Sequence, residues 1–182
     1  MSDSPNYRTA LAERSSYVEN ILIHRLVANL AGEMWRRDPS TPMHIFNSEV
    51  DESGFDLVLG CGDKLRYIQV KQVHLTGSAS KFSVRLEFTR LLGSCVIVIV
   101  HTADELQVDH YLFYGGAADE PMPSVEHNKP TISPIKKDAE GKKKVRAHYR
   151  DIPRRRFQGP LDTPTLLDVL FRSSHDNKEQ PC

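Results

Sequence analysis

The chain has 182 residues, of which 39% are hydrophobic and 26% are charged, as expected for one soluble domain with a real core. The 24 Lys and Arg residues balance the 24 Asp and Glu residues, so the total charge does not indicate a nucleic-acid partner. The three cysteines are too few for a disulfide framework, and with no secretory signal pattern or bilayer-length apolar run they favour a cytoplasmic protein without a membrane partner.

Helical periodicity extends over residues 12–37, and Asp38-Pro39 predicts its end because the residue before proline avoids helical angles. Glu19 falls inside the apolar stripe of this helix. It either lies near the helix start, where it favours the helix dipole, or reaches a polar site on a sheet beneath. The apolar stripe consists of Leu22, Ile23, Leu26, Val27, Leu30 and Met34.

Residues 43–50 predict a first strand, and two apolar runs on either side of Gly60–Asp63 predict a β-hairpin. Alternation in the second strand sends Gln69 and Lys71 to one face. Asp56 in the first strand of the hairpin adds a carboxylate, and Glu49 in the preceding strand is a reserve ligand. Because buried charges need a partner, Asp56 either pairs with Lys71 or helps to bind a metal ion.

The series Asp56, hairpin, Gln69-x-Lys71 resembles the PD-(D/E)XK nuclease superfamily, in the Gln variant carried by Mrr-like restriction enzymes. In that superfamily the preceding helix often donates a glutamate, and the position of Glu19 is similar. Phe55 stands where the family's name has proline. The resemblance implies a three-layer α/β/α, restriction-endonuclease-like domain with a mixed central sheet, with residues 1–116 as the nuclease-like core.

The resemblance also implies a metal-dependent DNA endonuclease of prokaryotic restriction, antiviral defence or mobile-element processing. Mg²⁺ or Mn²⁺ would be bound by Asp56, Glu19, Gln69 and the backbone carbonyl of Val70, and Lys71 would orient the attacking water. A neutral Gln69 predicts weaker metal affinity, or one ion in place of two. Gln69 also leaves a second function possible, that of a non-catalytic nucleic-acid-binding or assembly subunit on a decayed nuclease fold. An RNA-directed nuclease is a third alternative.

Beyond the hairpin, residues 72–81 form a small-residue loop that either offers N–H groups and hydroxyls to DNA or is a plain connection. Residues 82–92 are expected to include a short helix that ends at Gly93. The apolar run of residues 95–100 predicts a strand buried on both faces, with helices on each side of the sheet. Residues 109–114 predict a further strand.

Residues 117–182 are expected to form an irregular basic extension, with a long loop over residues 117–134 and a short helix over residues 163–171 that packs on the core. Residues 136–156 hold ten Lys and Arg against three acids, a net charge of +7. This run is either a solvated loop or a strip that contacts phosphates. The candidate nucleic-acid contacts are Lys81, Lys142, Lys143, Lys144, Arg146, Arg154, Arg155 and Arg156.

No recognition domain is apparent, so specificity is either low or supplied by a partner protein. Cutting both strands with one active site per chain calls for a homodimer, although the sequence contains no recognisable dimerisation element.

Overall fold

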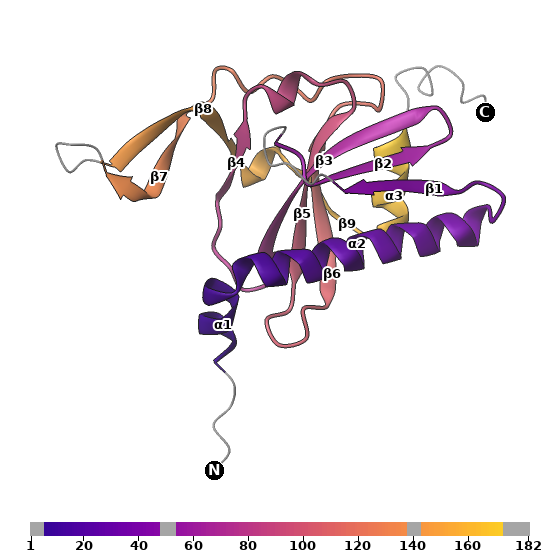
Figure 1. Ribbon diagram of the computed structural model, residues 1–182, viewed down its shortest axis with the longest axis horizontal. Coiled ribbons are helices and arrows are strands. Elements are labelled where there is room, and N and C mark those ends of the chain that lie inside the picture. Colours follow the sequence, from indigo (N-terminus) through magenta and orange to yellow (C-terminus); the bar gives the residue numbers. More distant parts are fainter. Residues whose placement is uncertain (1–5, 48–53, 138–142, 173–182) are drawn as a thin grey trace, which may run out of the picture.

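The computed structural model describes residues 6–47, 54–137 and 143–172. Two helices, α1 (Tyr7–Glu13) and α2 (Ser15–Arg37), precede a six-stranded central sheet (Figure 1). Its strands lie in the order β1-β2-β3-β5-β6-β9. Strand β5 runs parallel to β3, and the other neighbours are antiparallel, so the sheet is mixed. The strands are β1 (Met43–Asn47), β2 (Leu57–Cys61), β3 (Lys64–His74), β5 (Ser94–His101), β6 (Val108–Gly115) and β9 (Gln158–Leu161).

A second, three-stranded sheet has the order β4-β8-β7. Its strands β7 and β8 leave the body of the molecule as a two-stranded ribbon (Figure 1). Two short 3₁₀ turns, η2 (Phe88–Arg90) and η3 (Arg154–Arg156), flank this sheet, and α3 (Thr163–Phe171) ends the described chain. The strands of this sheet are β4 (Lys81–Arg85), β7 (Pro130–Lys137) and β8 (Lys143–Pro153).

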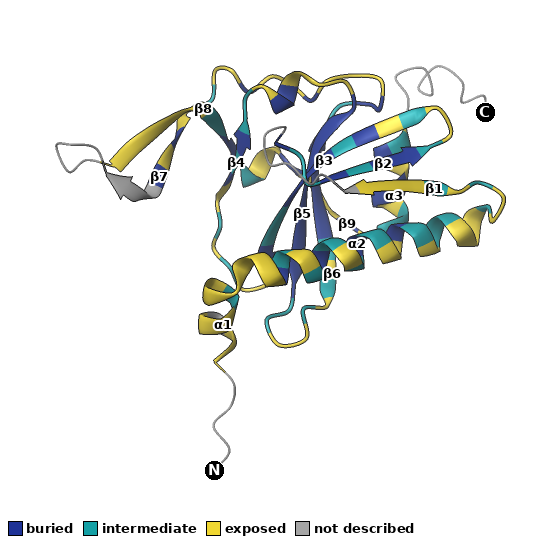
Figure 2. Cartoon of the chain, in the orientation of Figure 1, coloured by how far each residue is buried: buried dark blue, intermediate teal, exposed yellow. Residues whose placement is uncertain are grey.

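Helices α2 and α3 cover one face of the central sheet. The buried residues of α2 recur every fourth position, so one stripe of the helix meets the sheet. This stripe and the apolar side of α3 form one cluster with alternate residues of β2, β3 and β5, among them Leu57, Ile68 and Val70. Strand β5 is buried along its whole length, as the dark ribbon in Figure 2 shows.

The opposite face of the central sheet has a different cover. Val96, Val98 and Val100 of β5 pack there against a second cluster, which draws Phe82 and Val84 from β4. Ile152 of β8 and the connection after β6 complete it. The α/β class and the mixed sheet are confirmed. In the described ranges, however, this face carries strands, 3₁₀ turns and loops where we expected helices.

The C-terminal part is more regular than we predicted. Residues 130–137 and 143–161 form β7, β8, η3 and β9 in place of an irregular extension. Strand β9 pairs with β6 of the central sheet. Residues 82–92 contain the end of β4 and a 3₁₀ turn where we expected a helix. Strand pairing between distant segments explains these errors, because it leaves little local pattern.

Other predictions are confirmed. The hairpin β2–β3, the end of α2 at Asp38 and helix α3 lie where the sequence indicated.

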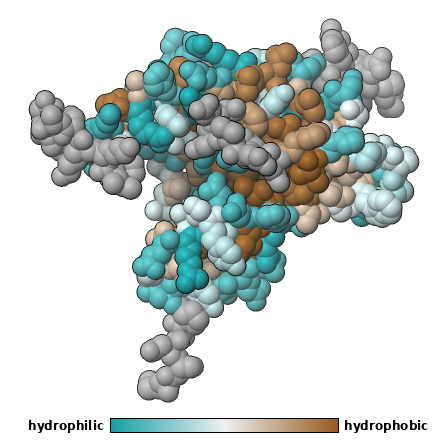
Figure 3. Space-filling view, in the orientation of Figure 1, coloured by the Kyte–Doolittle hydropathy of each residue, from teal (hydrophilic) through white to brown (hydrophobic). Residues whose placement is uncertain are grey.

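Among the described residues, no helix is both long and apolar enough to cross a bilayer. The space-filling view shows hydrophobic surface gathered in the middle of one face (Figure 3), and the exposed apolar residues of edge strand β1 are Ile45 and Phe46.

Candidate functional site

Asp56 is hydrogen-bonded to β3 at the point where the β2–β3 ladder ends. The last pair of that ladder is Leu57 with Ile68. One residue earlier, the backbone N–H of Asp56 donates to the carbonyl of Ile68 at 2.9 Å. The backbone N–H of Val70 in turn donates to Oδ2 of Asp56 at 2.7 Å. The carboxylate is therefore held against the Gln69-Val70-Lys71 segment, as the hairpin prediction required.

Gln69 presents an unusual buried oxygen. The side chain is only 8% exposed, and its Oε1 atom has no hydrogen-bond partner among the described residues. Leaving a buried acceptor unsatisfied costs ~1–3 kcal/mol, so such an atom calls for an explanation. Mg²⁺ and Mn²⁺ take oxygen ligands, and a bound cation would satisfy this atom. The residues present therefore fit a hard divalent ion.

The backbone of Val70 also faces Asp56. A strand residue in a hydrogen-bonded antiparallel pair directs its N–H and C=O to the same edge. Because the N–H of Val70 donates to Asp56, the carbonyl of Val70 points to that edge as well. The expected donor set thus combines a carboxylate, an amide oxygen and a backbone carbonyl.

Lys71 shares a face of β3 with Gln69. Ile68 and Val70 belong to the cluster under α2, whereas Val73 belongs to the cluster on the other face. Alternation along the strand puts Gln69 and Lys71 on the same side as Val73. Lys71 is half-buried. The predicted division of the strand into an apolar and a polar face is confirmed.

Glu19 is half-buried on α2, next to buried Val18. Arg25 and Asn29 lie on the opposite flank of this helix, where Arg25 donates to the carbonyl of Glu105 and Asn29 to the Tyr111 hydroxyl. Since these two face the β5–β6 side, Glu19 faces the β1–β2 side. Its convergence with Asp56 stays a prediction. Glu49, a reserve ligand on sequence grounds, lies outside the described residues.

The described residues contain no group of three or more His, Cys, Asp or Glu arranged to hold a metal. The donor set at Asp56 is of another kind, because it includes an amide and a backbone carbonyl. A transition-metal site rich in His or Cys is therefore absent from the described ranges, and a hard-ion site with oxygen donors is the arrangement to consider.

Arg85 is a further candidate residue of the site that the sequence analysis did not identify. Gly54, at φ 76°, packs so closely on β4 and η2 that a Cβ there would lie 3.3 Å from the Cβ atoms of Arg85 and Phe88. Arg85 thus lies beside the chain just before Asp56, and its Nε is 3.3 Å from Oε2 of Glu87. No local signal could have found it, since only tertiary packing brings β4 to this place.

Near the C-terminal end of β3, the buried residue His101 links two central strands. Nε2 of His101 is 2.8 Å from Oε1 of Gln72, and its Nδ1 donates to the carbonyl of Thr102 at 2.7 Å. Burial lowers the pKa of His101. The His101 ring therefore links β5 to β3 at Gln72, directly after Lys71 on the strand that carries the candidate site.

The predicted nucleic-acid contacts have different environments. Lys81 pairs with buried Asp151, and Arg156 donates to Oδ1 of Asn128 and lies over the Tyr114 ring, so both have structural partners. Lys142 lies outside the described residues. The remaining three on β8, which are exposed, are Lys143, Lys144 and Arg146.

Arg154 and Arg155 line a pocket of about 760 Å³, together with Ser78, Ser80 and His110. The backbone N–H of Arg154 donates to the carbonyl of Ser80 at 2.8 Å. The loop that follows β3 is thereby joined to the basic turn η3, so hydroxyls and guanidinium groups meet in one cavity. This is a suitable lining for a phosphate.

This basic pocket opens on the same sheet face as Lys71. Lys71, Val98 and Leu112 lie in register across β3, β5 and β6, and Leu112 lines the pocket. At ~4.8 Å per strand, the backbones of Lys71 and Leu112 are ~10 Å apart. The pocket and the Gln69–Lys71 face could therefore contact neighbouring phosphates of one nucleic acid.

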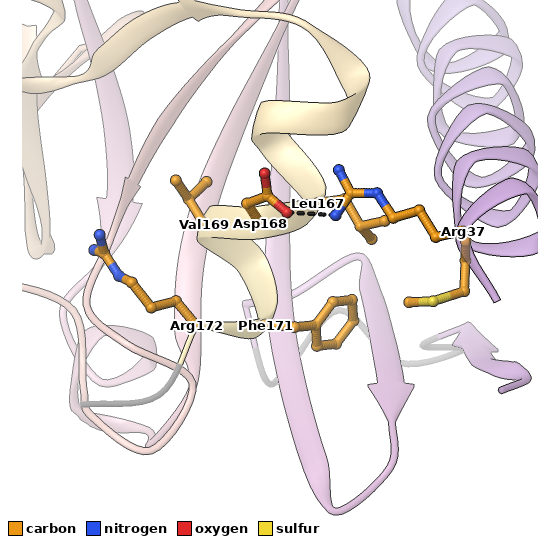
Figure 4. Close-up of a pocket in the computed structure, with 7 residues that line it drawn as sticks. Arg37, Leu167, Asp168, Val169, Phe171 and Arg172 are labelled. Carbon is orange, nitrogen blue, oxygen red and sulfur yellow. Dashed lines mark hydrogen bonds and ion pairs between the residues drawn. The ribbon is translucent and has the colours of Figure 1, made fainter. Parts of the chain in front are cut away.

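A second pocket of about 370 Å³ lies between the end of α2 and α3 (Figure 4). One of its cations, Arg37, is already paired with Asp168 and donates to Glu33 at 2.7 Å. Hydrogen bonds from Arg36 and Arg37 lower the pKa of Glu33 to about 2. The charges of Glu33, Arg37 and Asp168 are therefore paired with one another and link α2 to α3.

Comparison with protein-family models, curated proteins and solved structures finds no match for this chain.

Proposed function

We propose that this protein is a metal-dependent DNA endonuclease that hydrolyses phosphodiester bonds. The observation that carries the proposal is the buried Oε1 of Gln69, which has no hydrogen-bond partner in the described part of the chain. It lies on the strand that holds the Asp56 carboxylate through Val70. A buried oxygen acceptor and an anchored carboxylate are the types of ligand that a hard cation binds. The Gln69-x-Lys71 pattern supports the same chemistry through its resemblance to PD-(D/E)XK nucleases.

A bound Mg²⁺ or Mn²⁺ ion would polarise the scissile phosphate and acidify its water. In the proposal, Asp56 provides the negative charge that attracts the ion, and its hydrogen bond from Val70 holds one oxygen in place. Gln69 and the Val70 carbonyl complete the oxygen donors, with Glu19 as a second carboxylate. Lys71 orients the attacking water and stabilises charge on the phosphate.

The restriction-endonuclease-like architecture is part of the proposal. It is supported by the antiparallel β1-β2-β3 meander followed by β5 parallel to β3. The connection from β3 to β5 runs through β4 and η2, so the second helical layer of the expected fold would be replaced by a small sheet. A role in prokaryotic restriction, defence or mobile-element processing rests on the sequence resemblance.

The choice of a nucleic acid as substrate rests on the distribution of charge, and the choice of DNA rests on the sequence resemblance. Arg154 and Arg155 line the pocket on the Lys71 face, and the exposed cations of β8 lie beyond it. Such contacts neutralise phosphates without reading bases. They supply affinity, so any sequence preference would come from other contacts or from a partner protein.

Plasmid cleavage with Mg²⁺ or Mn²⁺ tests the proposal. Asp56→Ala and Lys71→Ala should each reduce cutting by at least ~100-fold, because even residues that only support metal ligands cost ~10–100-fold when mutated. Asp104→Ala and Arg14→Ala are matched controls. Asp104 is exposed in the connection between β5 and β6, and Arg14 is exposed at the start of α2, so both should leave cutting unchanged.

Cutting that survives both site substitutions would overturn the assignment. Binding of DNA without cutting in either metal would favour the second function, a non-catalytic binding or assembly subunit, which the neutral Gln69 supports. Parallel RNA substrates separate a ribonuclease from a deoxyribonuclease.

A further inference from the structure

The ribbon formed by β7 and β8 extends away from both hydrophobic clusters (Figure 1). Residues 149–153 of β8 pair with β4. Over Lys143–Arg146, by contrast, the pairs described for β8 are with β7. Residues 143–148 are all exposed, and Figure 2 shows this part of β8 as exposed along its length. At ~3.4 Å per residue these six residues span ~20 Å.

Thr131 and Ser133 of β7 are buried, whereas residues 143–148 of β8 are exposed on both faces, so the exposure of β8 needs a reason. An isolated two-stranded ribbon buries little apolar surface and is marginal in water. Here its cross-strand pair is apolar, since Ile132 lies opposite Val145, and these side chains are 52% and 54% exposed. An exposed apolar pair on a projecting ribbon indicates a surface that is covered when a partner binds.

The other side of the ribbon is basic. Lys144 and Arg146 are two residues apart and project from the face opposite Val145. The Arg146 guanidinium lies 3.5 Å from the centre of the Tyr149 ring, which holds it in place. Residues 143–150 contain two lysines, two arginines and one histidine, with no acid. The partner surface is therefore anionic.

The base of the ribbon is firmly anchored. Asp151 is buried, accepts a hydrogen bond from the Thr131 hydroxyl at 2.7 Å and pairs with Lys81. The Asn128 amide donates to the carbonyl of Asp151 at 2.9 Å. Both strands are thus joined to the body at one point, so the ribbon is positioned before it meets a partner.

We propose that the β7–β8 ribbon enters the major groove of duplex DNA, an inference that rests on DNA as the substrate of the proposed nuclease. The major groove of B-DNA is ~12 Å wide and ~8.5 Å deep and admits a two-stranded ribbon. Lys144 and Arg146 contact phosphates on the groove wall. Ile132 and Val145 face the base edges, where thymine methyl groups offer apolar contact.

The groove distinguishes DNA from RNA. The major groove of an A-form RNA duplex is deep and too narrow for side chains to read. A ribbon that used only phosphates would bind both duplexes alike. The proposed contact of the ribbon with the groove therefore makes the protein selective for double-stranded DNA.

Equilibrium binding to a short DNA duplex in EDTA, at several salt concentrations, tests the proposal. Lys144→Ala combined with Arg146→Ala should reduce the slope of log affinity against log salt by about 2, since each phosphate contact contributes ~0.9. Arg14→Ala combined with Arg172→Ala removes two exposed cations elsewhere and should leave the slope unchanged. Val145→Thr should weaken binding about fourfold, the value of one buried methyl-sized contact, without changing the slope.

An RNA duplex of the same sequence should bind at least about tenfold more weakly than DNA, because its major groove excludes the ribbon. An unchanged slope in the Lys144/Arg146 variant, or equal affinity for RNA and DNA, would overturn the inference. Because EDTA removes the metal, the outcome is independent of cleavage. If the protein cuts DNA and the Lys144/Arg146 variant binds normally, the inference about the ribbon alone is refuted. If the ribbon binds DNA but the protein does not cut it, the proposed nuclease activity alone is refuted.

Discussion

The amide oxygen of Gln69 shows how a single residue can indicate chemistry. Most buried polar atoms in proteins have hydrogen-bond partners, and this one has none among the described residues. Its neighbour on the chain, Val70, already donates to Asp56. A neutral oxygen in this place lowers the electrostatic cost of a site without a bound ion, because a second carboxylate here would add a further negative charge close to Asp56.

Gln69→Glu should therefore change both stability and metal response. Without metal, the buried second carboxylate should destabilise the fold by ~1–3 kcal/mol. With Mn²⁺, a tenfold gain in affinity should return ~1.4 kcal/mol at saturation. The measurement is thermal unfolding with and without Mn²⁺.

Gln158→Glu, at an exposed position on β9, is the control and should show neither effect. If Mn²⁺ stabilises Gln69→Glu no more than the unmodified protein, Gln69 is not a metal ligand.

At the level of elements, α2 and the β2–β3 hairpin form one unit. The buried stripe of α2 packs on Leu57, Ile68 and Val70, the residues that alternate with the polar positions of the candidate site. The apolar side of β3 thus orients its polar side, because a shift of one residue would exchange the two faces. Packing against α2 therefore positions Gln69 and Lys71.

Leu26→Ala should destabilise the protein by ~2–5 kcal/mol, since Leu26 is fully buried and the substitution leaves a cavity. Trp35→Ala on the same helix should change stability by less than ~0.5 kcal/mol, because Trp35 is 70% exposed. Urea unfolding of both variants measures the difference. Equal effects would mean that α2 does not pack on the sheet through this stripe.

Across the whole molecule, the C-terminal third completes the core. Strand β9 pairs with the central sheet at β6, and α3 contributes Leu166, Leu167 and Leu170 to the cluster under α2. Lys64 of the β2–β3 hairpin also donates to the carbonyl of Phe171 at 2.8 Å. The chain therefore closes its core with its last described elements.

A truncation after Phe157, which removes β9 and α3, should not reach a cooperative folded state. The lost leucines are fully or almost fully buried, and each costs ~2–5 kcal/mol even when only shortened to alanine, against a total stability of ~5–15 kcal/mol. Near-UV circular dichroism and thermal unfolding measure the result. A truncated chain with a sharp unfolding transition would mean that residues 1–157 can fold without β9 and α3.

The sequence alone determined the elements that have a strong local pattern. The stripe of α2, the glycine-bounded β2–β3 hairpin, the apolar run of β5 and the proline-led helix α3 were predicted, because periodicity and turn chemistry depend on neighbouring residues. The placement of Asp56 against Gln69-x-Lys71 followed from the hairpin itself.

Only the tertiary structure decided what depends on distant segments. The pairing of β8 with β4 turned a basic run into an anchored ribbon, and the packing of β4 brought Arg85 beside Gly54. The burial of the Gln69 oxygen belongs to the same class, since it results from the cover that other segments place over β3. Strand partners and burial are set by the free energy of the whole chain, so residues far apart in sequence determined these features together.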